Sequence, residues 1–222
     1  MTQREVLIPT PDGTCDASLH TPVGTGPWPA VIMFTDAGGV RETFHAMAQQ
    51  LADLGYAVLL PNVYYRLGEI EPFAMETVFT DPDERTRLMA LVLSVTKDAA
   101  TRDTEAILDF LAAQPEVADT KVGTTGYCMG GGLALTAAGR FPDRVGAAAS
   151  FHGGRIATTA ADSPHLLAGA MQATVVRRRR RERRFVRRRA VRGTVDRPDR
   201  RRGRSDAGHL PGSARLCVSG LM

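Results

Sequence analysis

Apolar residues follow two different spacings along the first 151 residues of this 222-residue chain. Short runs that are almost wholly apolar predict strands buried on both faces, whereas apolar residues three or four apart predict helices. Phe44, Met47, Ala48 and Leu51 have the helical spacing, and Gly55 marks the end of that helix. The predicted strands are Glu5–Ile8, Cys15–His20, Pro29–Phe34, Ala57–Leu60, Val122–Thr125 and Val145–Phe151, and the predicted helical segments are 43–54 and 83–113.

The order of these elements predicts a mostly parallel sheet covered by helices on both faces. The first two strands flank Pro11-Asp12-Gly13, which is a turn signal and indicates a small antiparallel entry to the sheet. Ligands of mostly parallel sheets bind beyond the carboxyl ends of the strands. Asp36, Cys128 and His152 each follow a predicted strand, so we expect them at that edge.

The segment Gly126-Tyr127-Cys128-Met129-Gly130 joins a β-branched run to an alanine-rich helix. A strand that turns sharply into a helix strains the residue at the turn, and the flanking positions admit only glycine because a Cβ atom would clash there. The thiol then lies at the amino end of a helix, where free amides and the helix dipole favour a thiolate. This pattern predicts a nucleophilic cysteine at position 128, and the alternative is a buried structural thiol.

Four segments resemble the dienelactone hydrolase family, cysteine-dependent α/β-hydrolases that act on lactones and related esters. The resemblance covers about residues 1–175 and implies an α/β-hydrolase fold with a small-molecule ester or lactone as substrate. The segments are Gly-Tyr-Cys-Met-Gly-Gly at 126–131, Thr-Asp-Ala-Gly-Gly-Val-Arg-Glu at 35–42, Leu-Pro-Asn-Val-Tyr-Tyr-Arg at 60–66 and Asp-Pro-Asp-Glu-Arg-Thr-Arg at 81–87.

The resemblance also implies roles for individual residues. Cys128 would attack the ester carbonyl and form an acyl-enzyme, while the backbone amides of Met129 and Ala37 would form the oxyanion hole. Asp36 stands where the family has a glutamate that exchanges a proton with the thiol, and its side chain is a methylene shorter. Arg87 matches an arginine that binds the substrate carboxylate.

Other interpretations of the candidate pocket residues stay open. Arg87 lies three or four residues after Asp83 and Glu84, and it equally fits a solvated helix charge paired with one of them. His152 is a candidate pocket residue, and the aromatic loop with Tyr64, Tyr65 and Phe73 indicates a partly apolar pocket. Because no metal-ligand spacing occurs in the chain, we expect neither a metal nor another cofactor.

Charge divides the chain into two parts. Residues 176–222 hold seventeen arginines against four acidic residues, a net charge of +13, whereas residues 1–175 hold eleven basic and twenty acidic residues, a net charge of −9. A run such as Arg177–Arg181 cannot fill a central parallel strand, which is buried on both faces. We therefore expect one α/β domain over 1–175, followed by a disordered tail in place of the last strands and helix.

The expected tail lies where the family supplies the histidine and the acid of its catalytic triad. Two explanations fit: a basic arm that binds polyanions, or an out-of-frame translation of a GC-rich gene. The second is favoured, because arginine codons read one base later permit a strand, an acid and a histidine in the family's order. His209 is the alternative base within the chain as written. Two hypotheses for the function follow. The chain is a cysteine hydrolase of esters or lactones, or it is an inactive relative of that family whose tail binds polyanions without sequence specificity.

Cysteine usage and hydropathy bear on the cellular compartment. Cys15 and Cys217 lack the setting of Cys128, and an odd count of three cysteines without framework spacing favours a reducing compartment. The sequence has neither a signal-peptide pattern nor an apolar segment long enough to span a membrane. We therefore expect a cytoplasmic protein without a membrane partner.

Overall fold

The structure is a computed structural model that describes residues 2–74 and 76–178. Seven strands and four α-helices occur in this part of the chain, together with the short 3-10 helices η1 (Tyr65–Leu67) and η2 (Pro164–Leu167). The strands are β1 Thr2–Thr10, β2 Gly13–Thr21, β3 Ala30–Phe34, β4 Ala57–Pro61, β5 Val122–Tyr127, β6 Val145–Phe151 and β7 Thr174–Arg178. The α-helices are α1 Glu42–Asp53, α2 Pro82–Ser94, α3 Lys97–Ala112 and α4 Met129–Arg140.

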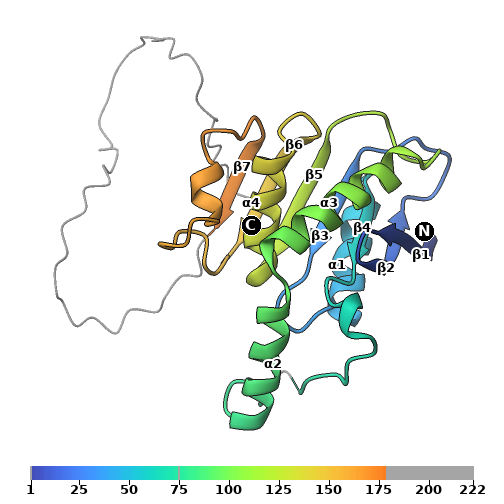
Figure 1. Ribbon diagram of the computed structural model, residues 1–222. Coiled ribbons are helices and arrows are strands. Elements are labelled where there is room, and N and C mark those ends of the chain that lie inside the picture. Colours follow the sequence, from blue (N-terminus) through green and yellow to red (C-terminus); the bar gives the residue numbers. More distant parts are fainter. Residues whose placement is uncertain (1, 75, 179–222) are drawn as a thin grey trace, which may run out of the picture.

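All seven strands form one sheet in the order β1-β2-β4-β3-β5-β6-β7 (Figure 1). The pairs β1-β2 and β2-β4 are antiparallel, and the four pairs from β4 to β7 are parallel. The turn at Pro11-Asp12-Gly13 joins β1 to β2, as predicted, and Gly13 has a φ of +135° that a side chain would disfavour. The mostly parallel sheet that the sequence predicts is therefore confirmed.

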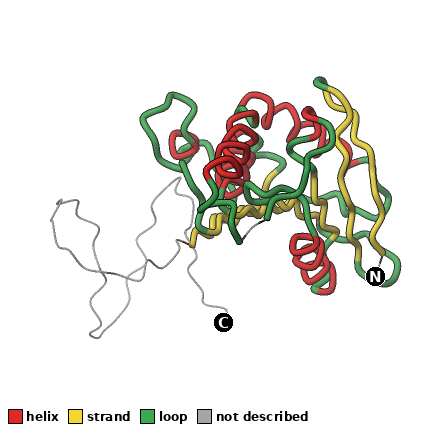
Figure 2. The backbone as a smooth tube through the Cα atoms, turned by 90° about the horizontal axis from the view of Figure 1, so that it is seen from below, coloured by secondary structure: helices red, strands yellow, loops and turns green. Residues whose placement is uncertain are grey.

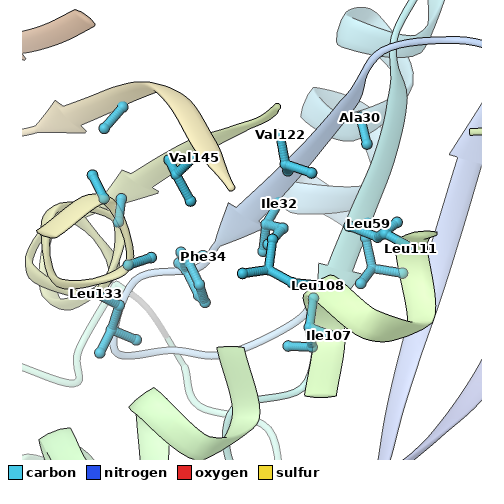
Figure 3. Close-up of a cluster of buried hydrophobic side chains, with 14 of the residues drawn as sticks. Ala30, Ile32, Phe34, Leu59, Ile107, Leu108, Leu111, Val122, Leu133 and Val145 are labelled. Carbon is cyan, nitrogen blue, oxygen red and sulfur yellow. The ribbon is translucent and has the colours of Figure 1, made fainter. Parts of the chain in front are cut away.

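Helices cover both faces of the sheet (Figure 2), and the alternation of side chains along the strands explains why. In β3, Met33 packs in one cluster with Phe44 and Ala48 of α1, whereas Ile32 and Phe34 belong to the larger cluster on the other face. That larger cluster contains Ile107, Leu108 and Leu111 of α3 and Leu133 of α4 (Figure 3). Strands buried on both faces need apolar residues at every position, which is the pattern that the sequence shows.

The helical segment predicted over 83–113 is two helices instead of one. Asp81 accepts hydrogen bonds from the amides of Asp83 and Glu84 and caps α2, while Thr96 accepts one from Ala99 and caps α3. The apolar spacing continues across the break, so periodicity alone does not reveal it, whereas the cap at Thr96 does. In Figure 1, α2 projects from the rest of the described chain. No helix in the described residues is long and apolar enough to cross a membrane.

The sheet extends one strand beyond the strands predicted from the sequence. β7 pairs in parallel with β6 and crosses the predicted domain boundary, because it includes Arg177 and Arg178. Val175 is buried and Val176 half-buried, whereas both arginine side chains are exposed. Backbone pairing does not require an apolar side chain at the end of a strand, so the two arginines fit there. The tail predicted over 176–222 otherwise lies outside the described residues, and so does His209.

A histidine pair lies between β2 and α1. His20 of β2 is 1% exposed, and its Nε2 lies 3.4 Å from Nδ1 of His45 in α1 and 3.4 Å from the hydroxyl of Ser18. Burial, as the largest cause, and the neighbouring His45 lower the pKa of His20, while Gln49 and Glu5 act in the opposite direction. The neutral imidazole is therefore the form that suits the folded protein.

Candidate active site

The backbone at Cys128 is in a strained conformation between β5 and α4. Its φ is +52° and its ψ is −113°, values that a residue with a side chain rarely adopts. The turn is tied to both neighbouring strands, because the amide of Cys128 donates to Phe151 O at 3.1 Å and the amide of Gly130 donates to Thr35 O at 3.1 Å. These bonds hold the thiol at the carboxyl edge of the sheet, as predicted from the sequence.

The glycines around Cys128 are required by close backbone approach. A Cβ atom on Gly126 would lie 1.9 Å from Gly130 O, and one on Gly130 would lie 2.3 Å from Thr35 O. Gly131 meets the Ser150 hydroxyl, where a Cβ atom would lie 2.6 Å away. Real Cβ atoms do not come so close to other atoms, so a side chain at these positions would push α4 away from the sheet.

The thiol of Cys128 is partly exposed and lies at the amino end of α4. Cys128 is the N-cap residue, and the first turn of α4 carries no acidic side chain. The free amides and the dipole of a helix amino end stabilise negative charge there. The sulfur of Cys128 therefore lies where negative charge that develops during a reaction meets free backbone amides.

Asp36 lies in the loop after β3, and its carboxylate is bound to Arg41. The two Arg41 nitrogens lie 2.7 and 2.8 Å from Asp36 Oδ1 and Oδ2, and the Gly38 amide donates to Oδ1 at 2.9 Å. No hydrogen bond joins Asp36 to the thiol of Cys128 within the described residues. The contact of Arg41 with Asp36 was not predicted from the sequence, because the two residues lie five positions apart in an irregular loop, where no regular spacing indicates a contact.

Ala37 and Met129, the two predicted oxyanion-hole residues, meet at Tyr64. The Tyr64 hydroxyl donates to Ala37 O at 2.9 Å and lies 3.6 Å from Met129 Sδ. Neither the amide of Ala37 nor that of Met129 donates a hydrogen bond to another residue of the described ranges. Burial, together with the negative charges of Asp36 and Cys128, raises the pKa of Tyr64 well above its ordinary value.

A pocket of about 740 Å³ lies beside these residues. Its wall includes the loop after Asp36, from Gly38 to Arg41, and the aromatic residues Tyr64, Tyr65 and Phe73. The partly apolar pocket predicted from that aromatic loop is thus present. Cys128 is not one of its lining residues, and Tyr64 connects the pocket to the turn that holds Cys128.

Arg87 lies in α2 and binds Glu84, which is one of the two pairings anticipated from the sequence. Arg87 Nη2 is 3.0 Å from Glu84 Oε2, Nη1 donates to Glu71 O at 2.9 Å, and the guanidinium lies 4.0 Å above the ring of Phe73. Arg87 thus supports the loop that forms one wall of the pocket without lining the pocket itself. Its role in carboxylate binding stays a prediction.

His152 follows β6, but its side chain is exposed and does not line the pocket. Its φ is +42°, and its amide donates to Arg178 O at 2.6 Å, so the backbone rather than the imidazole fixes this residue. No histidine contacts the thiol of Cys128 within residues 2–74 and 76–178. The described residues therefore do not place a histidine where it could accept the proton of the Cys128 thiol.

Comparisons with known proteins agree with this geometry. The chain is 32% identical over 143 residues to a carboxymethylenebutenolidase of Pseudomonas putida, covering 63% of this chain and 58% of that protein. It is 28% identical over 127 residues to a carboxymethylenebutenolidase of Rhodococcus opacus, covering 57% of this chain and 45% of that protein. The chain thus spans about half the length of the curated relatives that it matches.

The chain is also similar to solved structures and matches the model of a protein family. A dienelactone hydrolase-like promiscuous phosphotriesterase from metagenomic libraries is 29% identical, with a TM-score of 0.59 over 79% of this chain and 67% of that chain. A dienelactone hydrolase of Anabaena variabilis shares the fold, with a TM-score of 0.55 over 79% and 72% of the two chains. The model of the dienelactone hydrolase family matches residues 15–193, and the chain belongs to that family.

Proposed function

We propose that this chain hydrolyses a carboxylic ester or lactone through an acyl-enzyme on Cys128. The observation that carries the proposal is the strained turn that presents the Cys128 thiol at the amino end of α4. Family membership supports the reaction class, and the relatives named carboxymethylenebutenolidase support a lactone or an ester as substrate.

The proposed reaction begins with attack of the Cys128 thiolate on the carbonyl carbon. A C–S bond forms, the carbonyl oxygen becomes an oxyanion, and the collapse of that intermediate expels the alkoxide or phenolate. The amides of Ala37 and Met129 are the proposed donors to the oxyanion, and their lack of acceptors among the described residues supports this role. Water then hydrolyses the thioester and restores the thiol.

The proton acceptor is the part of the mechanism that the described residues do not supply. Asp36 is engaged by Arg41, so its exchange of a proton with the thiol requires that ion pair to open. Acylation by an activated ester needs only the thiolate and the oxyanion donors, whereas deacylation needs a base to activate water. The nucleophile can therefore be tested separately from turnover.

The test uses the full-length chain and p-nitrophenyl acetate, followed by nitrophenolate release and by peptide mass. We expect one equivalent of rapid release and an acetyl group on the Cys128 peptide. Cys128→Ala should abolish both signals, while Cys15→Ala should leave them unchanged. Acetylation that is absent, or that persists in Cys128→Ala, would contradict the proposal. A reducing compartment such as the cytoplasm would suit this thiol, and we propose that location.

A further inference from the structure

Tyr64 lies at the junction of the pocket and the turn that carries Cys128. It is 3% exposed, it lines the pocket, and its hydroxyl contacts Ala37 O and Met129 Sδ. Two segments far apart in sequence, the loop after β3 and the start of α4, thus meet at a single oxygen atom. No function has been assigned above to this side chain.

The Tyr64 ring is held firmly in place. Its backbone amide donates to Asn62 Oδ1 at 3.0 Å, and its ring packs over Gly39, where a Cβ atom would lie 3.4 Å from the ring. The next residue, Tyr65, donates to Asp103 Oδ1 at 2.9 Å and anchors the same loop to α3. The position of the Tyr64 hydroxyl is therefore set before any substrate binds.

The hydroxyl fixes the peptide that follows Ala37. The peptide that precedes Ala37 is fixed separately, because the Gly39 amide donates to Asp36 O at 3.1 Å. Since peptide groups are planar, the Asp36 carbonyl sets the direction of the Ala37 N–H, and the bond to the Ala37 carbonyl limits rotation at the Cα atom that joins the two peptides. The other bonds of this loop, from the Gly38 amide to Asp36 Oδ1 and from Arg41 to Gly39 O, do not involve Ala37, so without the hydroxyl the Ala37 carbonyl loses its restraint.

We propose that Tyr64 is a positioning residue for acyl transfer, whose hydroxyl holds the Ala37 carbonyl and so aims the Ala37 amide at the oxyanion. This inference rests on the proposed function. Oxyanion stabilisation depends on donors that are oriented before the reaction, so loss of this hydrogen bond slows acylation specifically. A reaction of the Cys128 thiol that forms no oxyanion does not use the Ala37 amide, so we expect it to keep its rate.

The test compares two reactions of the same thiol in the full-length protein. Acetylation by p-nitrophenyl acetate forms an oxyanion, whereas alkylation by iodoacetamide is a direct displacement that forms none. Both rates are measured on the Cys128 peptide by mass. In Tyr64→Phe we expect acetylation to slow by about 10-fold or more, with the alkylation rate within about two-fold of the wild type.

Tyr56→Phe is the control, because it removes a hydroxyl from an exposed tyrosine that neither lines the pocket nor contacts Ala37. It should leave both rates nearly unchanged, and melting curves confirm that both variants are folded at the assay temperature. Equal acetylation by wild type and Tyr64→Phe would overturn the role of Tyr64. A parallel loss of both reactions would also overturn it, as a merely structural effect. Absence of acetylation in the wild type would instead overturn the proposed function.

Discussion

Cys15 and Cys128 carry the same thiol group in two different environments, one buried in the sheet and one at its edge. Cys15 lies in β2, is 1% exposed, and has its Sγ 3.5 Å from Asp16 O and from Asn62 O. Burial, with the charges of Asp103 and Asp16, raises its pKa to about 12. Cys128 is partly exposed at a helix amino end. The comparison teaches that the place of a cysteine in the sheet, rather than its presence, predicts reactivity.

The largest expected effect is on thiol labelling. At pH 8 a thiol with a pKa near 12 is ionised to about one part in 10⁴, so iodoacetamide should label Cys128 at least about 100-fold faster than Cys15. Peptide mass distinguishes the two sites and also separates Cys217. In concentrated urea the labelling rates of Cys128 and Cys15 should become similar. Similar rates in the folded protein would contradict the difference between the two environments.

The strained turn can be broken without touching Cys15. Gly126→Ala places a Cβ atom 1.9 Å from Gly130 O, so we expect a loss of about 3 kcal/mol or more in the free energy of unfolding. Gly132→Ala, in α4, is the matched control, because its Cβ atom would meet Gly154 O at an ordinary 3.6 Å. Alanine favours a helix over glycine, so the control should gain up to about 1 kcal/mol. Urea unfolding measures the stability of both variants, and equal stabilities would contradict the close approach of Gly126 to Gly130 O.

The ion pair between Asp36 and Arg41 should affect the reactivity of Cys128. Arg41→Met leaves the Asp36 carboxylate without its partner. The unbalanced charge disfavours further negative charge nearby, so alkylation of Cys128 near pH 7 should slow roughly two- to five-fold. Arg41→Lys keeps the positive charge, and its rate should stay close to that of the wild type. An unchanged alkylation rate in Arg41→Met would show that Asp36 does not influence the thiol.

The smallest expected effect concerns His20, on the opposite face of β2 from Cys15. Its pKa in the folded protein is lowered mainly by burial, so the protonated form favours the unfolded chain. The stabilisation is complete above the unfolded value of about 6.5 and is lost as the pH falls toward the folded value. The urea midpoint should decrease between pH 7.5 and pH 5, and less so in His20→Gln. An equal decrease in both proteins would assign the effect to other groups.

Much of the fold follows from the sequence, because buried parallel strands have a distinctive pattern. The runs at Pro29–Phe34 and Ala57–Leu60 are apolar at nearly every position, and both are strands within a residue or so of the prediction. The break between α2 and α3 was not predicted, because Leu88, Leu91, Ile107 and Leu108 are buried on both sides of it. β7 was likewise not predicted, because its last two side chains are exposed arginines.

The site was predictable only where the backbone limits the choice of residue. Gly126 and Gly130 predict the turn at Cys128, because a side chain at either position would clash with the backbone. The contacts of Tyr64 and Arg41 join loops, and loops have no spacing from which a contact could be inferred. The pairing of Arg87 with Glu84 stayed one of two alternatives for a different reason, because helical spacing brings both Asp83 and Glu84 within reach of Arg87.

The shared position of Tyr64 has a consequence for how this protein can diversify. Because the Tyr64 side chain lines the pocket and also holds the Ala37 carbonyl, a mutation there should change substrate fit and reaction rate together if the proposed function holds. Glu69 and Glu71 line the same pocket, are exposed, and have no tie to Ala37 among the described residues. New substrate ranges should therefore evolve through the loop at 68–73, while Tyr64 remains under selection for both tasks.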